Sequence, residues 1–425
     1  MRNWQVSVGN SPVVLGFDFG GTKIATAVCD LMGNRLAAAT ISTGATGAGP
    51  ALAGEAAAAQ PASERGARAI FDRGIRAARE LLATVAPRSE LAAVGAATFG
   101  IPFEDRVELA PAIDGWESLA LGRELRAAFG GADVRLATDA KAAATAEVRW
   151  GALSGCDPGV YLNLGTGLAA AIVVGGKVVS GANGAAGEIG YNLRAISDAG
   201  LPLGQRVTLE DMVSGQALAL RAAGHGAGGP GRGGPGRGGP GTGAPGPGRG
   251  GPGTSGPGPG GSGPGWPADP AGRPMTAAGV FEASPGDPGL DDLITSFAAE
   301  LAFHLVNLAI CINPVRIAVG GGMVRSWERL RPQLEQALSA GVPFPPELVV
   351  AQFPYDAPLL GAVALAVDAA RGRLEQGHDS EGRELQDASL ARASPGTSAG
   401  EADGTAVTVG KDTMHQNTMI QDTRV

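Results

Sequence analysis

The sequence has few cysteines, no surplus of basic residues and no long uninterrupted apolar run. Its three cysteines, Cys29, Cys156 and Cys311, stand alone in or beside apolar segments, so we expect buried free thiols rather than disulfides or metal ligands. Lys and Arg number 33 against 41 Asp and Glu, a net charge of −8 at pH 7, which leaves no basic surface large enough for nucleic acid. The N-terminus carries no secretory signature, and no apolar run reaches the length of a membrane span. These absences predict a cytoplasmic protein with no nucleic-acid or membrane partner.

Glycine and proline, in contrast, are abundant, with 70 Gly and 30 Pro in 425 residues. Much of this excess lies in residues 222–273, a run of Gly-Pro-Arg repeats with almost no apolar residues to bury, which predicts a disordered insert. Its arginines would either contact a partner or belong to a tolerated surface insertion. Residues 374–425 are polar and uneven and predict a disordered tail. The remaining length suffices for two domains that each have a core.

One glycine-rich turn near the N-terminus organises the chain. An apolar run enters Asp18-Phe19-Gly20-Gly21-Thr22-Lys23 and a second apolar run leaves it, which predicts a β-hairpin with its tip at Asp18–Lys23. Gly20 and Gly21 lack a Cβ, so their N–H groups can approach an anion closely. Asp18 would reach a phosphate-bound Mg²⁺ directly or through water, and Thr22 and Lys23 add a hydroxyl and a cation. Alone, the motif also fits an ordinary Gly-Gly hairpin.

The same layout returns later in the chain. Residues 161–174 again read strand, Gly165-Thr166-Gly167 turn, strand, which predicts two similar α/β halves whose glycine turns cradle a polyphosphate together. A further strand, from Arg316, enters the Gly320-Gly321-Gly322 turn and opens a helix. Spacing elsewhere predicts helices over residues 63–86, 121–129, 140–150, 290–308 and 358–373, and strands over 91–99, 134–137 and 348–350. Residues 107–116 read as a strand running into a loop, and 37–62 show only a weak pattern.

Three acidic residues are candidates for the chemistry. Asp139 stands at a strand-to-helix junction, where a carboxylate could accept the proton of an alcohol during phosphoryl transfer; the alternative is a simple helix N-cap. Glu188 lies in a glycine-rich bend that would suit hydrogen bonds to sugar hydroxyls. Glu210 is a second acid for that purpose, or else a first-turn helix acid favoured by the helix dipole.

Five segments, in this order, resemble the ROK family of sugar kinases and sugar-responsive repressors. They are Asp18-Phe19-Gly20-Gly21-Thr22-Lys23, Thr138-Asp139-Ala140-Lys141-Ala142-Ala143, Leu164-Gly165-Thr166-Gly167, Gly184 to Gly190, and Asn313-Pro314 through Gly320-Gly321-Gly322. The resemblance covers nearly all of residues 13–372 except the insert. It implies an α/β, two-domain actin-like ATPase (ribonuclease H-like) fold with an interdomain cleft. The first domain would span residues 12–134, completed by a C-terminal helix at 357–373, and the second would span 135–356.

The resemblance also implies ATP, Mg²⁺ and a role for each matching residue. Asp139 would be the general base. The sugar would be bound by Gly100, Thr138, Glu188, Tyr191 and Glu210. ATP and its phosphates would be held by Asp18, Gly20, Gly21, Thr22, Lys23, Gly165, Thr166, Gly167, Gly320, Gly321 and Gly322, with Asp18 serving the metal. A homodimer is expected.

The sequence departs from the family at several sugar-site positions. The family usually has asparagine where this chain has Ala112, Thr138 and Lys141, and histidine where it has Tyr191. Because each hydrogen bond to a hydroxyl contributes about 0.5–1.5 kcal/mol, we expect glucose to bind less well, by about tenfold or more. Lys141 and Tyr191 would instead suit a bulkier, acylated or acidic sugar.

A second departure concerns zinc. The family's three zinc cysteines fall on Leu201, Leu203 and Thr208, so we predict no structural zinc and expect Leu201 and Leu203 to pack this loop instead. The prediction is therefore an ATP-dependent kinase of a hexose or amino sugar. The alternative is a catalytically weak sugar- or nucleotide-binding sensor. A DNA-binding repressor is not expected, because only about a dozen residues precede the hairpin and a helix-turn-helix needs more.

Overall fold

The computed structural model describes residues 11–44, 66–226 and 276–373, all within one compact unit, Met1–Leu374. The predicted tail 374–425 and residues 227–273 of the predicted insert lie outside these ranges. The first residues assigned to the insert, 222–226, are instead the last turn of a helix, α4 (Gly215–Gly226).

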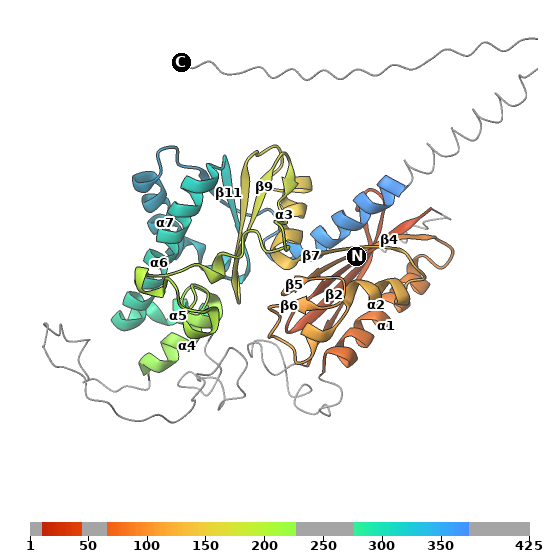
Figure 1. Cartoon of the computed structure of the whole chain (residues 1–425), viewed down its shortest axis with the longest axis horizontal. Coiled ribbons are helices and arrows are strands. Elements are labelled where there is room, and N and C mark those ends of the chain that lie inside the picture. The colour runs from red at the N-terminus through yellow and green to blue at the C-terminus, as the bar shows by residue number, and fades with distance from the viewer. Residues whose placement is uncertain (1–10, 45–65, 227–275, 374–425) are drawn as a thin grey trace, which may run out of the picture. The chain divides into compact units, whose positions relative to one another are not determined.

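Two five-stranded sheets form the framework (Figure 1). The first contains β1 (Val13–Phe19), β2 (Lys23–Asp30), β3 (Arg35–Ser42), β4 (Leu91–Thr98) and β7 (Asp133–Thr138), in the order β3-β2-β1-β4-β7. The second contains β8 (Gly159–Leu164), β9 (Leu168–Val174), β10 (Lys177–Val178), β11 (Arg316–Gly320) and β12 (Glu347–Val350), in the order β10-β9-β8-β11-β12. In both sheets the first three strands in sequence are antiparallel and the last two add in parallel. The predicted internal repeat is confirmed.

The hairpin at the head of each sheet is confirmed as well. β1 and β2 pair from Val13↔Asp30 to Phe19↔Ile24, and β8 and β9 pair up to Leu164↔Leu168. The sequence analysis missed β3, which lies in the segment described there as weakly patterned. β3 is an edge strand whose residues are only half-buried or exposed, so its alanine- and threonine-rich sequence carries little apolar contrast.

Helices connect the parallel strands, because a parallel pair needs a long crossover. They are α1 (Ala67–Val85), α2 (Leu121–Ala128), α3 (Asp139–Trp150), α4, α5 (Ala277–Ala283), α6 (Pro288–Ile312), α7 (Trp327–Gly341) and a final helix at 357–373. Short elements are the strands β5 (Ile101–Pro102) and β6 (Val107–Glu108) and the 3-10 turns η2 (Trp116–Ser118), η3 (Ile189–Tyr191), η4 (Ile196–Asp198), η5 (Leu203–Gln205), η6 (Ser284–Gly286) and η7 (Gly322–Ser326). The predicted helices are observed, with α4 and α5 in addition.

Each sheet has its own apolar core. In the first, the rings of Phe17 and Phe19 stack with centroids 5.1 Å apart and meet α1 through Phe71. In the second, α6 and α7 pack on the sheet with residues such as Leu301 and Leu330. Fully burying each such side chain contributes about 1.5–3 kcal/mol, so each core stabilises the sheet on which it lies.

The final helix returns to the first sheet and packs on its other face, through Val363 and Ala366 against Val14 and Ala93 (Figure 1, blue). Glycines allow this close approach. A Cβ on Gly361 would lie 1.7 Å from the carbonyl oxygen of Ala142 in α3. The final helix and α3 are therefore in backbone contact.

A buried carboxylate fixes the other end of α3. Glu147 is fully buried and accepts hydrogen bonds from the backbone N–H groups of Ala152 (2.7 Å), Gln352 (3.0 Å) and Phe353 (2.7 Å). Backbone donors to a buried carboxylate offset the cost of taking its charge out of water. Glu147 thus ties α3 to the segment that leads from β12 into the final helix, a role the sequence analysis did not foresee.

The three cysteines differ in their burial. Cys29 and Cys156 are buried free thiols as predicted, but Cys311 on α6 is exposed, so the prediction for it is wrong. Cys311 lies near the end of α6, outside the face of the helix that packs into the core.

α6 is also long and apolar enough to cross a membrane by composition, and 44% of its most apolar stretch is buried against the second core.

Replacing Gly361 by Ala tests the contact between α3 and the final helix. The added Cβ would meet a backbone carbonyl at 1.7 Å, and backbone cannot yield as a side-chain end can. We expect the free energy of unfolding to fall by about 1–3 kcal/mol or more, measured by denaturant titration. A Cβ on Gly372 in the same helix would have no atom within 4 Å, so Gly372→Ala should be neutral or stabilising. Equal stability of the two variants would contradict this packing.

Candidate active site

The first predicted turn closes as a tight hairpin. The N–H of Gly20 donates to the carbonyl of Lys23 (2.9 Å), and the Thr43 hydroxyl donates to the carbonyl of Gly21 (2.8 Å). Thr22 and Lys23 are exposed at the tip. Asp18 precedes this turn as the second-last residue of β1, so its carboxyl group lies at the end of the strand.

The two later glycine turns lie against each other. A Cβ on Gly321, whose φ is +92°, would be 2.5 Å from the carbonyl oxygen of Leu164. The Gly165–Gly167 turn is held from the other side by the start of α4, where the N–H of Gly215 donates to the carbonyl of Gly165 (2.8 Å). The structure therefore brings together two of the three turns predicted to hold ATP, Gly165–Gly167 and Gly320–Gly322.

Asp139 is the first residue of α3 and is not its cap. The N-cap is Thr138, whose hydroxyl oxygen accepts from the N–H of Lys141 (3.4 Å). The carboxylate of Asp139 accepts from the N–H of Ala140 (2.7 Å). Burial raises its pKa above the ordinary value, while the Ala140 hydrogen bond and the Lys141 charge lower it. The interpretation of Asp139 as a helix cap is therefore wrong, and the structure gives that role to Thr138.

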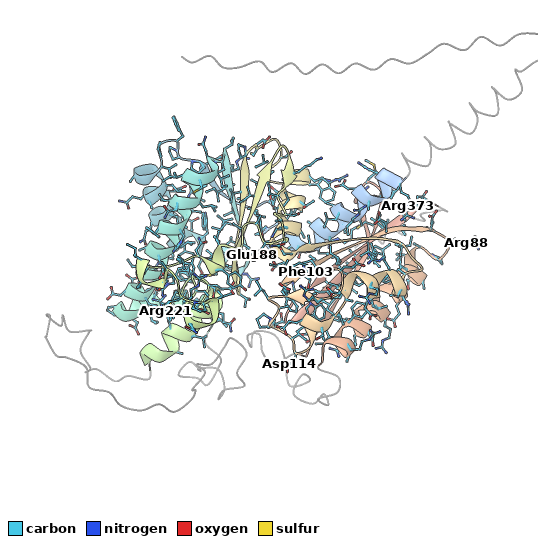
Figure 2. All side chains as sticks on the ribbon, in the orientation of Figure 1. Arg88, Phe103, Asp114, Glu188, Arg221 and Arg373 are labelled. Carbon is cyan, nitrogen blue, oxygen red and sulfur yellow. The ribbon has the colours of Figure 1, made fainter. Side chains whose placement is uncertain are left out.

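Lys141 is paired within the protein. Its ammonium nitrogen lies 3.3 Å from Oε1 of Glu188, with the two side chains 6% and 20% exposed. Glu188 follows directly on Gly187, whose carbonyl accepts from the N–H of Ala170 in β9 (2.8 Å; Figure 2 labels Glu188). Burial raises the pKa of Glu188, Lys141 lowers it and the charge of Asp139 raises it. The ammonium group of Lys141 is thus paired with the carboxylate of Glu188.

Glu210 lies in a turn before α4, which begins only at Gly215, so the first-turn helix interpretation is wrong. Its Oε2 accepts from the N–H of Leu168 (2.7 Å). A Cβ on Gly167 would be 2.5 Å from that oxygen, so this glycine leaves the room that Glu210 occupies. Burial raises the pKa of Glu210, the Leu168 hydrogen bond lowers it, and the charges of Asp139 and Glu188 are among those that raise it.

Asp18 joins this group from the first sheet. Burial raises its pKa from 3.8 to about 7, with the charge of Asp139 next in size, Lys23 lowering it and Asp356 raising it. Asp18, Asp139, Glu188 and Glu210 therefore form one electrostatically coupled group of carboxyls, which we call the carboxylate cluster. The structure thus brings the four predicted acids together.

Two further residues belong to this region and were not predicted as site residues. The charge of Asp356 raises the pKa of Asp18, and burial, followed by the charge of Asp139, raises the pKa of Tyr161 in β8. The position of Asp356 directly before the final helix was a usable sequence signal; Tyr161 sits in an ordinary strand pattern and gave none. Tyr191 is half-buried, and burial, followed by the charge of Glu210, raises its pKa to about 12.

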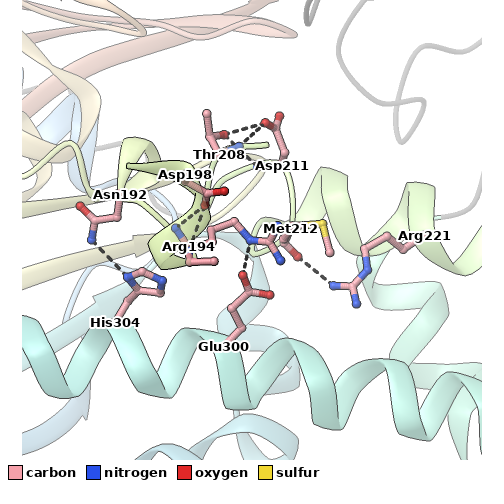
Figure 3. Close-up of polar contacts among 10 residues, drawn as sticks. Asn192, Arg194, Asp198, Thr208, Asp211, Met212, Arg221, Glu300 and His304 are labelled. Carbon is pink, nitrogen blue, oxygen red and sulfur yellow. Dashed lines mark hydrogen bonds and ion pairs between the residues drawn. The ribbon is translucent and has the colours of Figure 1, made fainter. Parts of the chain in front are cut away.

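A loop between Glu188 and Glu210 is fastened to α6 (Figure 3). Arg194 pairs with Glu300, and the amide nitrogen of Asn192 lies 3.4 Å from Nδ1 of His304. Leu201 and Leu203 do not pack this loop as predicted; they are 44% and 42% exposed. The loop is held by polar contacts with α6 instead.

Neither Leu201, Leu203 nor Thr208 can ligate zinc as cysteine would, and Thr208 pairs with Asp211 (2.8 Å; Figure 3). Over residues 11–44, 66–226 and 276–373, no group of three or more His, Cys, Asp and Glu is arranged to hold a metal ion. The absence of zinc stays a prediction.

Comparisons with known proteins agree on one family. The model of the ROK family matches residues 14–369. The bifunctional enzyme NanE/NanK of Brucella melitensis is 27% identical over 361 residues, which are 84% of this chain and 54% of that protein. The glucokinase of Streptomyces coelicolor is 31% identical over 207 residues, 48% of this chain and 57% of that protein.

Among solved structures, a ROK family glucokinase from Streptomyces griseus in complex with glucose and AMPPNP has a TM-score of 0.55 and 26% identity, covering 83% of this chain and 99% of that one. The predicted α/β actin-like ATPase fold is thereby confirmed. The chain spans about half the length of the curated relatives it matches.

The raised pKa of Asp18 makes stability depend on pH. Since the carboxyl binds its proton more tightly in the folded protein (pKa about 7) than in the unfolded chain (3.8), the free energy of unfolding should fall as pH rises through this range. In Mg²⁺-free buffer, Asp18→Asn should be more stable than the wild type at pH 8, by up to about 4 kcal/mol, and by less at pH 5. Denaturant titrations at both pH values measure this. The exposed Asp292→Asn retains Asp18, so its difference in stability from the wild type should be the same at both pH values; an equal pH-dependent difference in both variants would contradict the assignment.

The polar fastening of the loop predicts independence from zinc. Elemental analysis of the purified protein should find no stoichiometric zinc, and EDTA should leave the melting temperature unchanged. Arg194→Met should lower the free energy of unfolding by about 1–3 kcal/mol, because it leaves the largely buried Glu300 unpaired. The exposed Arg88→Met is the control. One zinc per chain, or destabilisation by EDTA, would refute the prediction.

Proposed function

Since the chain belongs to the ROK family, we propose that it is a sugar kinase that transfers the γ-phosphoryl group of ATP to a hydroxyl of a hexose or amino sugar. The observation that carries the proposal is the carboxylate cluster, in which the charge of Asp139 acts on Asp18, Glu188 and Glu210. The proposed reaction needs a base near both a phosphate-binding acid and sugar-binding acids.

In this proposal Asp139 is the general base. Its carboxylate accepts the proton of the sugar hydroxyl as the sugar oxygen forms a bond to the γ-phosphorus, while the bond from that phosphorus to the β-phosphate oxygen breaks and ADP leaves. The raised pKa of Asp139 supports the role, because a base works best when its pKa lies near the working pH. The Ala140 N–H and the Lys141 charge oppose this rise in the pKa of Asp139.

The glycine turns would hold the phosphates. The first two turns would offer the backbone N–H groups of Gly21, Thr22, Thr166 and Gly167 and the side chains of Thr22, Lys23 and Thr166, while the N–H groups of Gly20 and Gly165 close the turns themselves. Gly320–Gly322 would lie toward the adenosine. The support is the close contact of Gly321 with the Leu164–Gly165 backbone, which leaves no side chain between the second and third turns. Charge on the phosphates is stabilised by such donors without any rearrangement.

Mg²⁺ fits the chemistry of this site. Asp18 is a hard oxygen donor whose pKa is held near 7 by burial and by the negative charges of Asp139 and Asp356, so a cation there would relieve repulsion. Mg²⁺ commonly binds through one or two carboxylates together with substrate phosphates, which agrees with the lack of a three-ligand cage among the described residues. Asp18 would hold the ion, which would neutralise charge on the phosphates.

For the sugar, Glu188 and Glu210 would accept hydrogen bonds from hydroxyls, and Gly100, Thr138 and Tyr191 would complete the sugar site. The solved glucokinase neighbour contains glucose and AMPPNP, which supports a sugar and ATP as the substrates here. Lys141 faces Glu188, so it does not by itself favour an acidic sugar. The homodimer expected from the family resemblance stays a prediction.

A sugar- or nucleotide-binding sensor is the second candidate. It is favoured by one observation, that one oxygen of Glu188 is already occupied by Lys141. The sensor would bind ligands without turnover.

ADP release with Mg²⁺-ATP and a panel of hexoses, N-acetylhexosamines and sugar acids tests the proposal. We expect turnover with one class of sugar, and a loss of about 10²–10⁴-fold in kcat for Asp139→Asn with ATP binding retained. Asp292→Asn is the matched control and should keep full activity. If no sugar in the panel gives ADP release while ATP still binds, the sensor is favoured. An unchanged kcat in Asp139→Asn would show that this residue is not the general base.

A further inference from the structure

The most unusual charged side chain of the described chain is Lys141. It is 4% exposed and is the one Lys or Arg among the buried polar residues of the described ranges. Burying an ammonium group costs several kcal/mol unless it is paired. We therefore expect the charge of this buried lysine to have an electrostatic role.

The backbone of Lys141 is fixed with respect to Asp139. It lies two residues along the same helix, and its own N–H donates to the Thr138 cap. The far end of α3 is held by Glu147 through three backbone donors. Lys141 is thus presented from a rigid element, while its partner Glu188 lies in a segment of bends and 3-10 turns.

We propose that Lys141 is the positioning residue of the sugar site, holding Glu188 in one orientation and serving as the buried counter-charge of the carboxylate cluster. The inference rests on the proposed function only in taking Glu188 as a sugar ligand. With Oε1 occupied by the lysine, Glu188 presents its Oε2 to a sugar hydroxyl in a fixed direction. Without Lys141, the side chain is free to rotate and repels its acidic neighbours.

The charges around the base support this role. The groups that face Asp139 or Glu188 from the surrounding elements are Asp18 on β1, Tyr161 on β8, Lys141 on α3, Tyr191 on η3 and Glu210 in the turn before α4. Of these, only Lys141 is a cation, and it lowers the pKa of both Asp139 and Glu188. Its removal should move the acid limb of the pH–rate profile to higher pH.

The test compares Lys141→Met, Lys141→Arg and the exposed control Lys177→Met with the wild type. Removing a hydrogen bond between charged groups predicts about a tenfold or larger rise in the KM for the sugar in Lys141→Met, with the KM for ATP within about twofold and the acid limb of kcat moved to higher pH. Lys141→Arg keeps the charge and should restore most of both. Lys177→Met should match the wild type.

A second background separates positioning from a general structural effect. In Glu188→Gln protein, Lys141→Met should add less than about threefold to the sugar KM, because the partner it positions is already neutral. This double variant leaves no unpaired buried charge at the pair, so it keeps the test open if Lys141→Met alone folds poorly. Additive effects, an equal rise in the ATP KM, or an unchanged sugar KM in Lys141→Met would each overturn the inference.

Sugar affinity measured by calorimetry without ATP distinguishes this inference from the proposed function. If the wild type binds a sugar without phosphorylating it, the proposed kinase activity is contradicted. A tenfold weaker sugar affinity in Lys141→Met would in that case still support the positioning role. Turnover by the wild type with unchanged affinity in Lys141→Met removes the positioning role alone. A wild type that neither binds nor phosphorylates any sugar removes both.

Discussion

Electrostatic repulsion within the carboxylate cluster opposes folding, and the structure around the cluster has to offset it. Asp18, Asp139, Glu188 and Glu210 are each taken out of water, which raises the pKa of each, and the charge of Asp139 further raises the pKa of the other three. Such an arrangement opposes folding, so it persists only because the surrounding structure holds it. The compensation comes from backbone donors at Ala140 and Leu168 and from the buried ammonium group of Lys141.

The framework that holds the cluster is built from two copies of one sheet topology. Each copy places a glycine turn after its first strand, and the crossover helices set the ends of the parallel strands side by side. α3 is capped by Thr138 at one end, anchored through Glu147 at the other and in backbone contact with Gly361. Its first residue, Asp139, is therefore held rigidly, as a general base has to be.

Most regular elements could be predicted from the sequence because their apolar spacing is strong. The hairpin β1–β2, the helix α6 with its Asp287 cap and the turn after β11 follow directly from local pattern. β3 could not, since a half-exposed edge strand of alanine and threonine has little contrast. The exposure of Leu201 and Leu203 and of Cys311 was also missed, because side-chain type alone does not say whether a neighbour covers it.

The amino-acid order alone was enough to identify the family, the repeat of the two halves and the acids of the site, since each is written in short motifs with fixed spacing. The contacts that those acids make became visible only in the folded chain. The pairing of Lys141 with Glu188 spans 47 residues, and that of Glu147 with the Gln352 N–H spans 205. Local spacing carries no information on such pairs, because they depend on how whole elements pack against each other. The sequence led us to expect Lys141 as a ligand of acidic sugars, whereas in the folded protein it pairs with the protein's own Glu188 carboxylate.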